Sequence, residues 1–196
     1  IYVTGTSILF GCILNSVAAF GFAMFDFKFK NPLFGLVLLS FMIPFEAIAL
    51  PLYKVADKLK MVNTYQGMIL PSIASGLVLF LFVQFFKDIP PDLLDAARID
   101  GANIRRIYTR ILMPLSKPIF ITAGLMILMD QWNSYLWPLL IARSKEIRTI
   151  QIALTQFNTE HGTAWSALYA GSMFAALIPL LLFLPLQKYF VQGITS

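Results

Sequence analysis

Long apolar runs that hold at most one charged residue each constrain this chain more than any other feature of its sequence. Such runs cover residues 4–25, 32–53, 66–86, 118–142 and 162–187. Each is long enough to cross a bilayer, because a transmembrane helix needs about 20 predominantly apolar residues. In lipid every backbone N–H and C=O must be paired within the protein, so we expect helices and not open strands.

The composition agrees with a membrane-embedded fold for the whole chain. Hydrophobic residues make up 58% of the 196 positions and charged residues 13%, against about 25% charged in soluble domains. We therefore predict an all-α, polytopic membrane protein whose five transmembrane helices form a single domain over residues 1–196. Because the first apolar run starts so close to Ile1, we expect further sequence upstream in the natural protein.

The sequence argues against metal, redox and nucleic-acid chemistry. Cys12 and His161 are the only residues of their types, so we predict neither a disulfide nor a metal site. The net charge of +5 comes from basic residues in short loops between apolar runs. That pattern is typical of membrane topology, so no nucleic-acid partner is expected.

Prolines and small residues predict how the helices bend and pack. A helix can approach a neighbour closely where small residues share one face, as Ala167, Gly171 and Ala175 do at four-residue spacing. Proline removes a backbone donor and bends a helix. We expect helix kinks at six prolines inside the apolar runs: Pro44, Pro51, Pro71, Pro138, Pro179 and Pro185.

One polar segment, residues 87–117, is long enough to form structure of its own. It contains the densest group of basic residues in the chain, and cytoplasmic loops carry an excess of Lys and Arg. We therefore place it in the cytoplasm, which puts nine basic residues inside and six outside. The inner ones are Lys28, Lys30, Lys87, Arg98, Arg105, Arg106, Arg110, Lys117 and Lys188; the outer ones are Lys54, Lys58, Lys60, Arg143, Lys145 and Arg148.

This segment is predicted to fold as two helices joined at a glycine. Asp88, followed by two prolines, is typical of a helix N-cap, and a short helix should then run to about Ile99. Gly101 suits a sharp turn. After it, apolar residues at positions 104, 107, 108, 111 and 112 predict an amphipathic helix that returns to the membrane. Such an elbow would serve as a docking site for another protein, although a plain solvated connector has the same periodicity.

The elbow also carries a longer pattern. The stretch D-A-A-R-I-D-G-A-N at 95–103, followed by I-L-M-P at 111–114, resembles the EAA loop of ABC importer permeases, whose pattern is E-A-A, three residues, Gly, nine residues, then I-x-L-P. Five residues match it: Ala96, Ala97, Gly101, Ile111 and Pro114. Two depart from it, since Asp95 replaces the glutamate and Met113 the leucine. The shorter Asp95 side chain puts in doubt the strength of any ion pair it makes with a partner.

The resemblance extends over nearly the whole chain, to the carbohydrate or maltose-type branch of that family. It is carried by N-S at 15–16, M-I-P at 42–44, I-A-L-P-L-Y at 48–53, N-T-Y-Q-G at 63–67, I-L-P at 69–71 and Q-W-N-S-Y-L-W-P-L at 131–139. Relative to that branch, the usual first helix and part of the C-terminal tail are absent from this sequence. The missing tail puts in doubt any contact that it makes with the ATPase subunits.

This resemblance implies a permease subunit of a binding-protein-dependent ABC importer for a sugar or oligosaccharide, in a bacterial or archaeal inner membrane. The helix at 92–101 would be the coupling helix that docks into a cytoplasmic ATPase subunit, which binds ATP and Mg²⁺. A second permease subunit would complete the pore. An extracytoplasmic solute-binding protein would meet the outer loop at 143–161. The chain itself has no G-x-x-x-x-G-K-[ST] phosphate loop, so we expect no catalytic residue and no cofactor in it.

Two charged residues inside the apolar runs are candidates for the substrate path, because buried charge in a membrane is costly. Counting about 1.5 Å per residue, Glu46 and Asp130 lie at similar depth in the outer half of the membrane. If the run at 118–142 is one helix, Asp130, Asn133 and Trp137 share a face. Hydroxyl-binding groups beside an aromatic ring suit a sugar, although a structural polar network with Trp137 in the interfacial aromatic belt would show the same residues.

Three other functions remain to be separated from sugar import. The same architecture could carry a peptide, phosphate or another small solute. An ion-coupled secondary transporter should show internal repeats and an ion site, and the chain has no visible repeat. An intramembrane hydrolase would need a nucleophile and base or a metal pair, such as H-E-x-x-H, which the sequence lacks.

Overall fold

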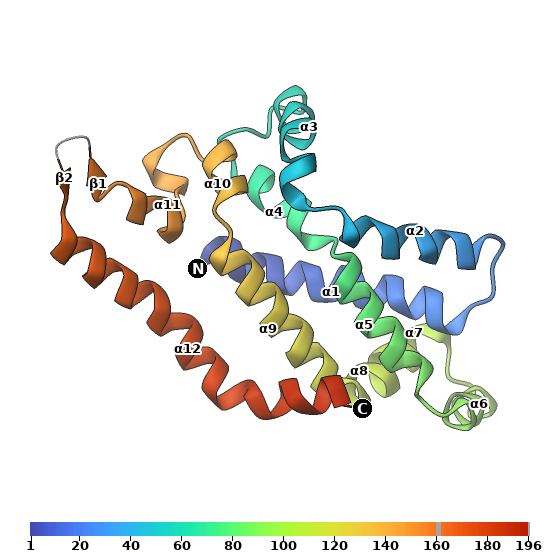
Figure 1. The fold of residues 1–196 in the computed structure, drawn as a ribbon. Coiled ribbons are helices and arrows are strands. Elements are labelled where there is room, and N and C mark those ends of the chain that lie inside the picture. The colour runs from blue at the N-terminus through green and yellow to red at the C-terminus, as the bar shows by residue number, and fades with distance from the viewer. Residues whose placement is uncertain (160–161, 196) are drawn as a thin grey trace.

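The structure, a computed structural model, describes residues 1–159 and 162–195 and is almost entirely helical (Figure 1). The first half holds α1 (Tyr2–Met24), α2 (Lys30–Met42), α3 (Phe45–Lys58), α4 (Tyr65–Ile73), α5 (Gly76–Lys87) and α6 (Pro91–Ile99). The second half holds α7 (Ile104–Arg106), the π-helix η1 (Ile107–Leu112), α8 (Met113–Leu115), α9 (Lys117–Asn133), α10 (Leu136–Ile141), the 3₁₀-helix η2 (Lys145–Ile147), α11 (Ile150–Thr155) and α12 (Trp165–Thr195). Two short strands, β1 (Asn158–Thr159) and β2 (Gly162–Thr163), pair antiparallel before α12.

Within the described residues, two helices are long and apolar enough to cross a bilayer by themselves, and up to five spans result if each of three bent helix pairs counts as one. α1 and the Trp165–Gln187 part of α12 are unbroken helices that are long and apolar enough to cross a bilayer. Three bent pairs pass the same test only together: α2 with α3, α4 with α5, and the helical segment Ile104–Leu115 with α9. The Ile104–Leu115 segment of the third pair belongs to the predicted cytoplasmic elbow. This confirms the predicted class, an all-α polytopic bundle, while three of its candidate spans are broken.

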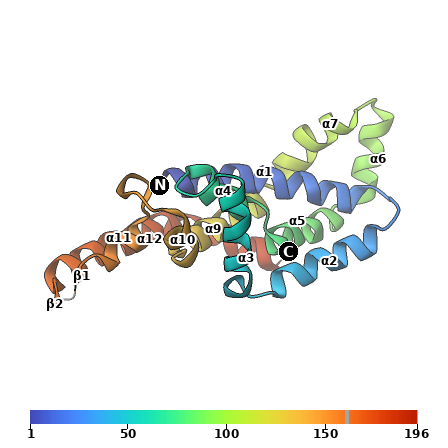
Figure 2. The same cartoon turned by 90° about the horizontal axis from the view of Figure 1, so that it is seen from above.

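The second span departs most from its prediction. Residues 32–53 were expected to form one kinked helix, but α2 and α3 meet at an angle of 103°. Pro44 disfavours helical geometry in the residue before it, and Ile43 is extended, with a ψ of 121°. α3 therefore turns away from α2, as the view from above shows (Figure 2).

The main core lies between α1, α5 and α9. Phe82 and Phe86 of α5 are fully buried there, and the Phe82 ring meets the Phe120 ring of α9 edge to face at 4.8 Å between centroids. Edge-to-face pairs of this kind are a favoured aromatic geometry. The three helices thus form the body on which the remaining elements are mounted.

The small-residue face of α12 makes helix contacts, as predicted: Ala175 lies against α9 and Gly171 against α11. The Trp132 indole N–H of α9 donates to the Ala175 carbonyl oxygen at 2.8 Å, and Ala175 is buried. A Cβ on Gly171 would lie 2.7 Å from Leu154 Cδ2 of α11. Close approach at Gly171 and Ala175 therefore sets the path of α12.

The elements sort to two ends of the bundle (Figure 1). The α1–α2 loop, α6, α7, α8 and the end of α12 lie at one end, whereas α3, α10, α11 and the hairpin lie at the other. This is the division of loops that the charge pattern predicted. His161 lies outside the described residues.

Candidate functional site

α6 is the first arm of the predicted elbow, with slightly different limits from those expected. It runs from Pro91 to Ile99, and its N-cap is Pro90 with no capping side chain. The prediction that Asp88 caps this helix is wrong. The Asp88 N–H instead donates to the Gln84 carbonyl oxygen at 3.2 Å, so Asp88 ends α5.

The two faces of α6 have different roles. Leu94 and Ala97 are buried against the core of the chain. Leu93 and Ile99 are exposed, Ile99 at 86%, and Ala96 is exposed between them. We call Leu93, Ala96 and Ile99 the apolar ridge. By the resemblance, Ala97 belongs with Ala96 to the coupling helix; in the structure Ala97 packs against the core of its own chain.

The turn after α6 is built as predicted around Gly101. Its φ is +78°, a left-handed conformation that glycine adopts without a Cβ penalty. The Gly101 N–H donates to the Arg98 carbonyl at 3.0 Å and the Ala102 N–H to the Ala97 carbonyl at 2.9 Å. This pair of bonds is the Schellman ending of a helix, and it fixes the angle between the two arms.

Asp95 forms an ion pair within α6 itself. Its Oδ1 lies 2.9 Å from Arg98 Nη1, and both side chains are largely exposed. Exposed pairs of this kind contribute at most about 1 kcal/mol. The Asp95 carboxylate therefore remains accessible beside the ridge but already has a partner.

Four of the five predicted apolar residues of the second arm are buried or half-buried, whereas Ile104 is 57% exposed, and the arm is not a regular α-helix. Asn103 Oδ1 accepts the Arg106 N–H at 2.9 Å and begins α7, after which six residues form the π-helix η1. The Met113 N–H donates five residues back, to the Tyr108 carbonyl, and Pro114 has no N–H to continue either pattern. Ile111 packs on the core and Pro114 is exposed, and neither belongs to the ridge.

A cavity of about 500 Å³ lies beside Asp130. Its polar lining is Ser72 and Ser75, at the junction of α4 and α5, together with the Asp130 carboxylate. No Lys or Arg is among its ten lining residues, and the other seven are apolar. Sequence reasoning missed both serines, although hydroxyls next to Pro71 in an apolar run are a signal of a broken span.

The other predicted path residues do not gather around this cavity. Glu46 is exposed in the first turn of α3, where a carboxylate is favoured by the helix dipole, and it lines neither this cavity nor the outer pocket described next. Asn133 is exposed, and its Nδ2 donates to the Met129 carbonyl oxygen at 2.8 Å.

Trp137 does not share a helix face with Asp130 and Asn133, which corrects the prediction. α9 ends at Asn133, and Ser134 is extended, with a ψ of 124°, so Trp137 belongs to α10. It is buried, and its indole N–H donates to the Gly67 carbonyl oxygen at 3.0 Å. The extended residue interrupts the periodicity on which the predicted shared face depended.

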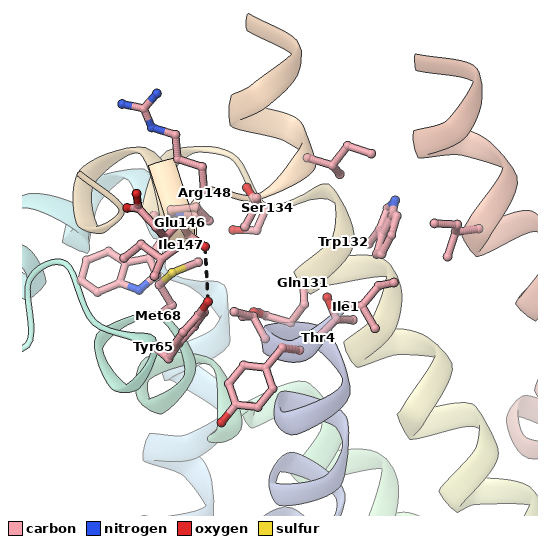
Figure 3. A pocket seen from close by; sticks show the side chains of 17 residues that line it. Ile1, Thr4, Tyr65, Met68, Gln131, Trp132, Ser134, Glu146, Ile147 and Arg148 are labelled. Carbon is pink, nitrogen blue, oxygen red and sulfur yellow. Dashed lines mark hydrogen bonds between the residues drawn. The ribbon is translucent and has the colours of Figure 1, made fainter. Parts of the chain in front are cut away.

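A second pocket, of about 280 Å³, is lined by residues of α1, α4, α9, α10 and the outer loop (Figure 3). We call it the outer pocket. Aromatic side chains from four segments line it: Tyr2, Tyr65, Trp132 and Trp137. The Tyr65 hydroxyl donates to the Glu146 carbonyl oxygen at 3.3 Å. Gln131 lines this pocket while the adjacent Asp130 lines the other, so the end of α9 separates the two.

The polypeptide around this outer pocket is held by hydrogen bonds at its rim. Asn63 Oδ1 accepts the N–H groups of Arg143 and Ser144 at 3.1 and 2.8 Å, which ties the α3–α4 turn to the outer loop. The pKa of the exposed Glu146 carboxyl is lowered, first by its own backbone N–H and then by the Ser144 hydroxyl.

Within 1–159 and 162–195, no three His, Cys, Asp or Glu residues gather into a possible metal site.

A bundle of apolar helices with an exposed elbow at one end, and a mostly apolar cavity that includes Ser72, Ser75 and Asp130, fits a membrane transport subunit. The chain belongs to the family of binding-protein-dependent transport system inner membrane components, whose pattern matches residues 7–195. It is therefore a multi-pass inner-membrane protein of a transport system and not an enzyme.

Known relatives agree with this assignment. The chain is 41% identical over 181 residues to the arabinooligosaccharides transport system permease protein AraQ of Bacillus subtilis (strain 168), a match that covers 92% of this chain and 64% of AraQ. It is 35% identical over 198 residues to the sn-glycerol-3-phosphate transport system permease protein UgpE of Agrobacterium fabrum, covering 100% of this chain and 70% of UgpE. The chain thus spans about two thirds of the length of these relatives.

The fold is also that of a solved importer. A bacterial ABC transporter involved in the import of the acidic polysaccharide alginate contains a chain that superposes with a TM-score of 0.79 at 21% identity. The match covers 96% of this chain and 73% of the other. The likeness confirms the helical permease architecture.

Proposed function

We propose that this chain is the permease subunit of a sugar or oligosaccharide importer, moved by a separate cytoplasmic ATPase through the elbow. A second permease subunit completes the pore, and an extracytoplasmic binding protein delivers the sugar at the end that carries the outer pocket. The proposal draws on the similarity to AraQ, whose name specifies arabinooligosaccharides, and on the resemblance of the elbow to an EAA loop.

The apolar ridge carries the proposal. An isoleucine that is 86% exposed, next to exposed Leu93 and Ala96 on a short rigid helix, leaves apolar area that a partner groove would remove from water. The buried side of the same helix, Leu94 and Ala97, joins the elbow to the core of the bundle. A displacement of the ridge by the partner therefore also displaces the packed body of α1, α5 and α9, because close-packed interiors transmit strain.

Ile99→Asp tests this contact. Burying an isoleucine side chain contributes about 1.5–3 kcal/mol, so replacing it by a charge should lower the amount of ATPase that co-purifies with the permease by roughly 10- to 100-fold. The permease itself should retain its thermal unfolding temperature. Ile99→Leu is the matched control and should bind ATPase normally. Normal ATPase recovery with Ile99→Asp would contradict the docking role.

The cavity beside Asp130 favours a neutral hydroxylated solute. A carboxylate with two serine hydroxyls offers partners to sugar hydroxyls, whereas a phosphate group would meet the carboxylate with no cation in the lining. A phosphorylated polyol is the second candidate, because UgpE, at 35% identity, is named for sn-glycerol-3-phosphate. Uptake of labelled neutral sugars against labelled glycerol phosphate by the intact importer separates the two.

Asp130→Asn and Asn133→Ala test the path at the outer end of α9. If these groups bind solute, each variant should raise the KM for uptake about 5- to 20-fold, the effect of losing one hydrogen bond to a charged or polar group. Recovery of the assembled complex and its basal ATP hydrolysis should not change. Unaltered uptake kinetics in an intact complex would show that the solute passes elsewhere.

A further inference from the structure

One buried side chain closes the break in the α4–α5 span. α4 ends at Ile73 and α5 begins at Gly76, with 41° between them. Asn15 of α1 is 2% exposed, and its Nδ2 donates to the Ile73 carbonyl oxygen at 2.8 Å. Its Oδ1 accepts the Ser75 N–H at 3.2 Å. A single amide therefore satisfies backbone groups on both sides of the break, which lipid could not do.

The next residue of α1 is bonded to the elbow. Ser16 is fully buried, and its Oγ lies 2.7 Å from the Tyr108 hydroxyl oxygen in η1. Ser16 also donates to the Ile13 carbonyl oxygen at 3.1 Å. Because a serine hydroxyl has one proton, the Tyr108 hydroxyl is the donor in its bond to Ser16. The centroid of the Tyr108 ring lies 5.3 Å from the centroid of the Phe20 ring, and Phe20 is another residue of α1.

α1 is held tightly where these two bonds meet. Asn15 Nδ2 also donates to the Gly11 carbonyl oxygen at 2.7 Å. A Cβ on Gly11 would lie 2.9 Å from Ile127 Cδ1 of α9 and 3.6 Å from the Ile73 oxygen, so α1 approaches both neighbours closely there. Consecutive residues of a packed helix cannot shift independently, so a displacement of Tyr108 is shared with the break.

We propose that Tyr108, Ser16 and Asn15 form a positioning link through which the elbow sets the geometry of the α4–α5 break. The break carries Ser72 and Ser75 into the cavity beside Asp130, so the link joins the coupling element to the solute path. This proposal rests on the proposed function only because it takes the elbow as the part that an ATPase moves. All three are positioning residues, and none of them lines either cavity.

The test measures opening of the break directly. Val78 follows the break in α5, is 2% exposed and lines the cavity, so a thiol there reacts with a maleimide only when the break opens. Val78→Cys is made in a Cys12→Ala background of the full importer complex. Loss of one hydrogen bond at Tyr108→Phe or Ser16→Ala should speed labelling about three- to tenfold, and Asn15→Leu should speed it more than tenfold.

Thr109→Val is the matched control, because it removes a hydroxyl from the neighbouring residue of η1. The Thr109 hydroxyl donates to the Arg105 carbonyl oxygen at 2.8 Å, within the elbow, so labelling should stay at the wild-type rate. Equal labelling rates for Tyr108→Phe and Thr109→Val would overturn the link, even if Asn15→Leu opened the break. Solute import is assayed on the same preparations. If the wild-type complex imports no sugar, the proposed function fails while the labelling result still decides the link.

Discussion

Gly67→Ala should destabilise the outer end of the bundle by about 3 kcal/mol, at the top of the range for overpacked sites. A Cβ at this position would lie 2.1 Å from the Met61 carbonyl oxygen and 3.0 Å from its carbon. Both are backbone atoms, so no rotamer change relieves the clash. The turn before α4 would have to move, and with it the Thr64 cap and the Trp137 bond to the Gly67 carbonyl.

Thermal unfolding of the detergent-solubilised protein measures this effect. Gly21→Ala in α1 is the matched control, since a Cβ there meets nothing within 4 Å. Alanine in a helix interior is favoured over glycine by about 0.5–1 kcal/mol, so this variant should unfold at the wild-type temperature or slightly above it. Equal unfolding temperatures for the two variants would show that the 61–67 turn yields freely.

Ala96→Glu and Ala97→Glu should both stop transport, but for different reasons. Ala97 is buried against the core, and a charge left unpaired there costs about 3–5 kcal/mol, so this variant should lose thermal stability. Ala96 is exposed on the apolar ridge, so its variant should remain folded and lose the ATPase. We therefore expect separate roles for the neighbouring alanines of the EAA-like pattern.

Two measurements on each variant distinguish these outcomes: the unfolding temperature of the permease alone and the amount of ATPase that co-purifies with the assembled complex. Serine in place of either alanine is a control of nearly the same size, and Ala96→Ser should behave as wild type in both assays. A stable Ala97→Glu permease that still fails to bind ATPase would place Ala97 on the docking surface, as the sequence alone had indicated.

Periodicity and span length predicted much of the fold because they depend on local sequence alone. The runs at 4–25 and 162–187 coincide with the two unbroken candidate spans, Gly101 forms the left-handed turn, and Gly171 and Ala175 pack closely as their spacing indicated. In each case the cause is local. The length of an apolar run is compared with the thickness of the bilayer, glycine lacks a Cβ, and residues at four-residue spacing share a helix face.

Features that depend on a distant partner were not predicted. The elbow helix α6 carries apolar residues on two sides, so its sequence does not tell which side packs against its own chain. In the structure the side with Leu94 and Ala97 packs against the core. Proline marked a bend at Pro44, but neither its size of 103° nor the break after Asn133 follows from residue type. An asparagine inside an apolar run signals a polar contact, yet only the fold supplies Ile73 and Ser75 as its partners.

The shallow packing of α12 has a mechanical consequence. α12 has far less of its surface buried than α1, the other unbroken span. Gly171 approaches Leu154 of α11, and the Ala175 carbonyl oxygen accepts the Trp132 indole N–H of α9. Tyr169, Met173 and Phe174 point away from the chain and are each about two thirds exposed. α12 therefore leaves a broad apolar face that its own chain does not cover, and a change in its tilt would alter mainly its contacts with α9 and α11.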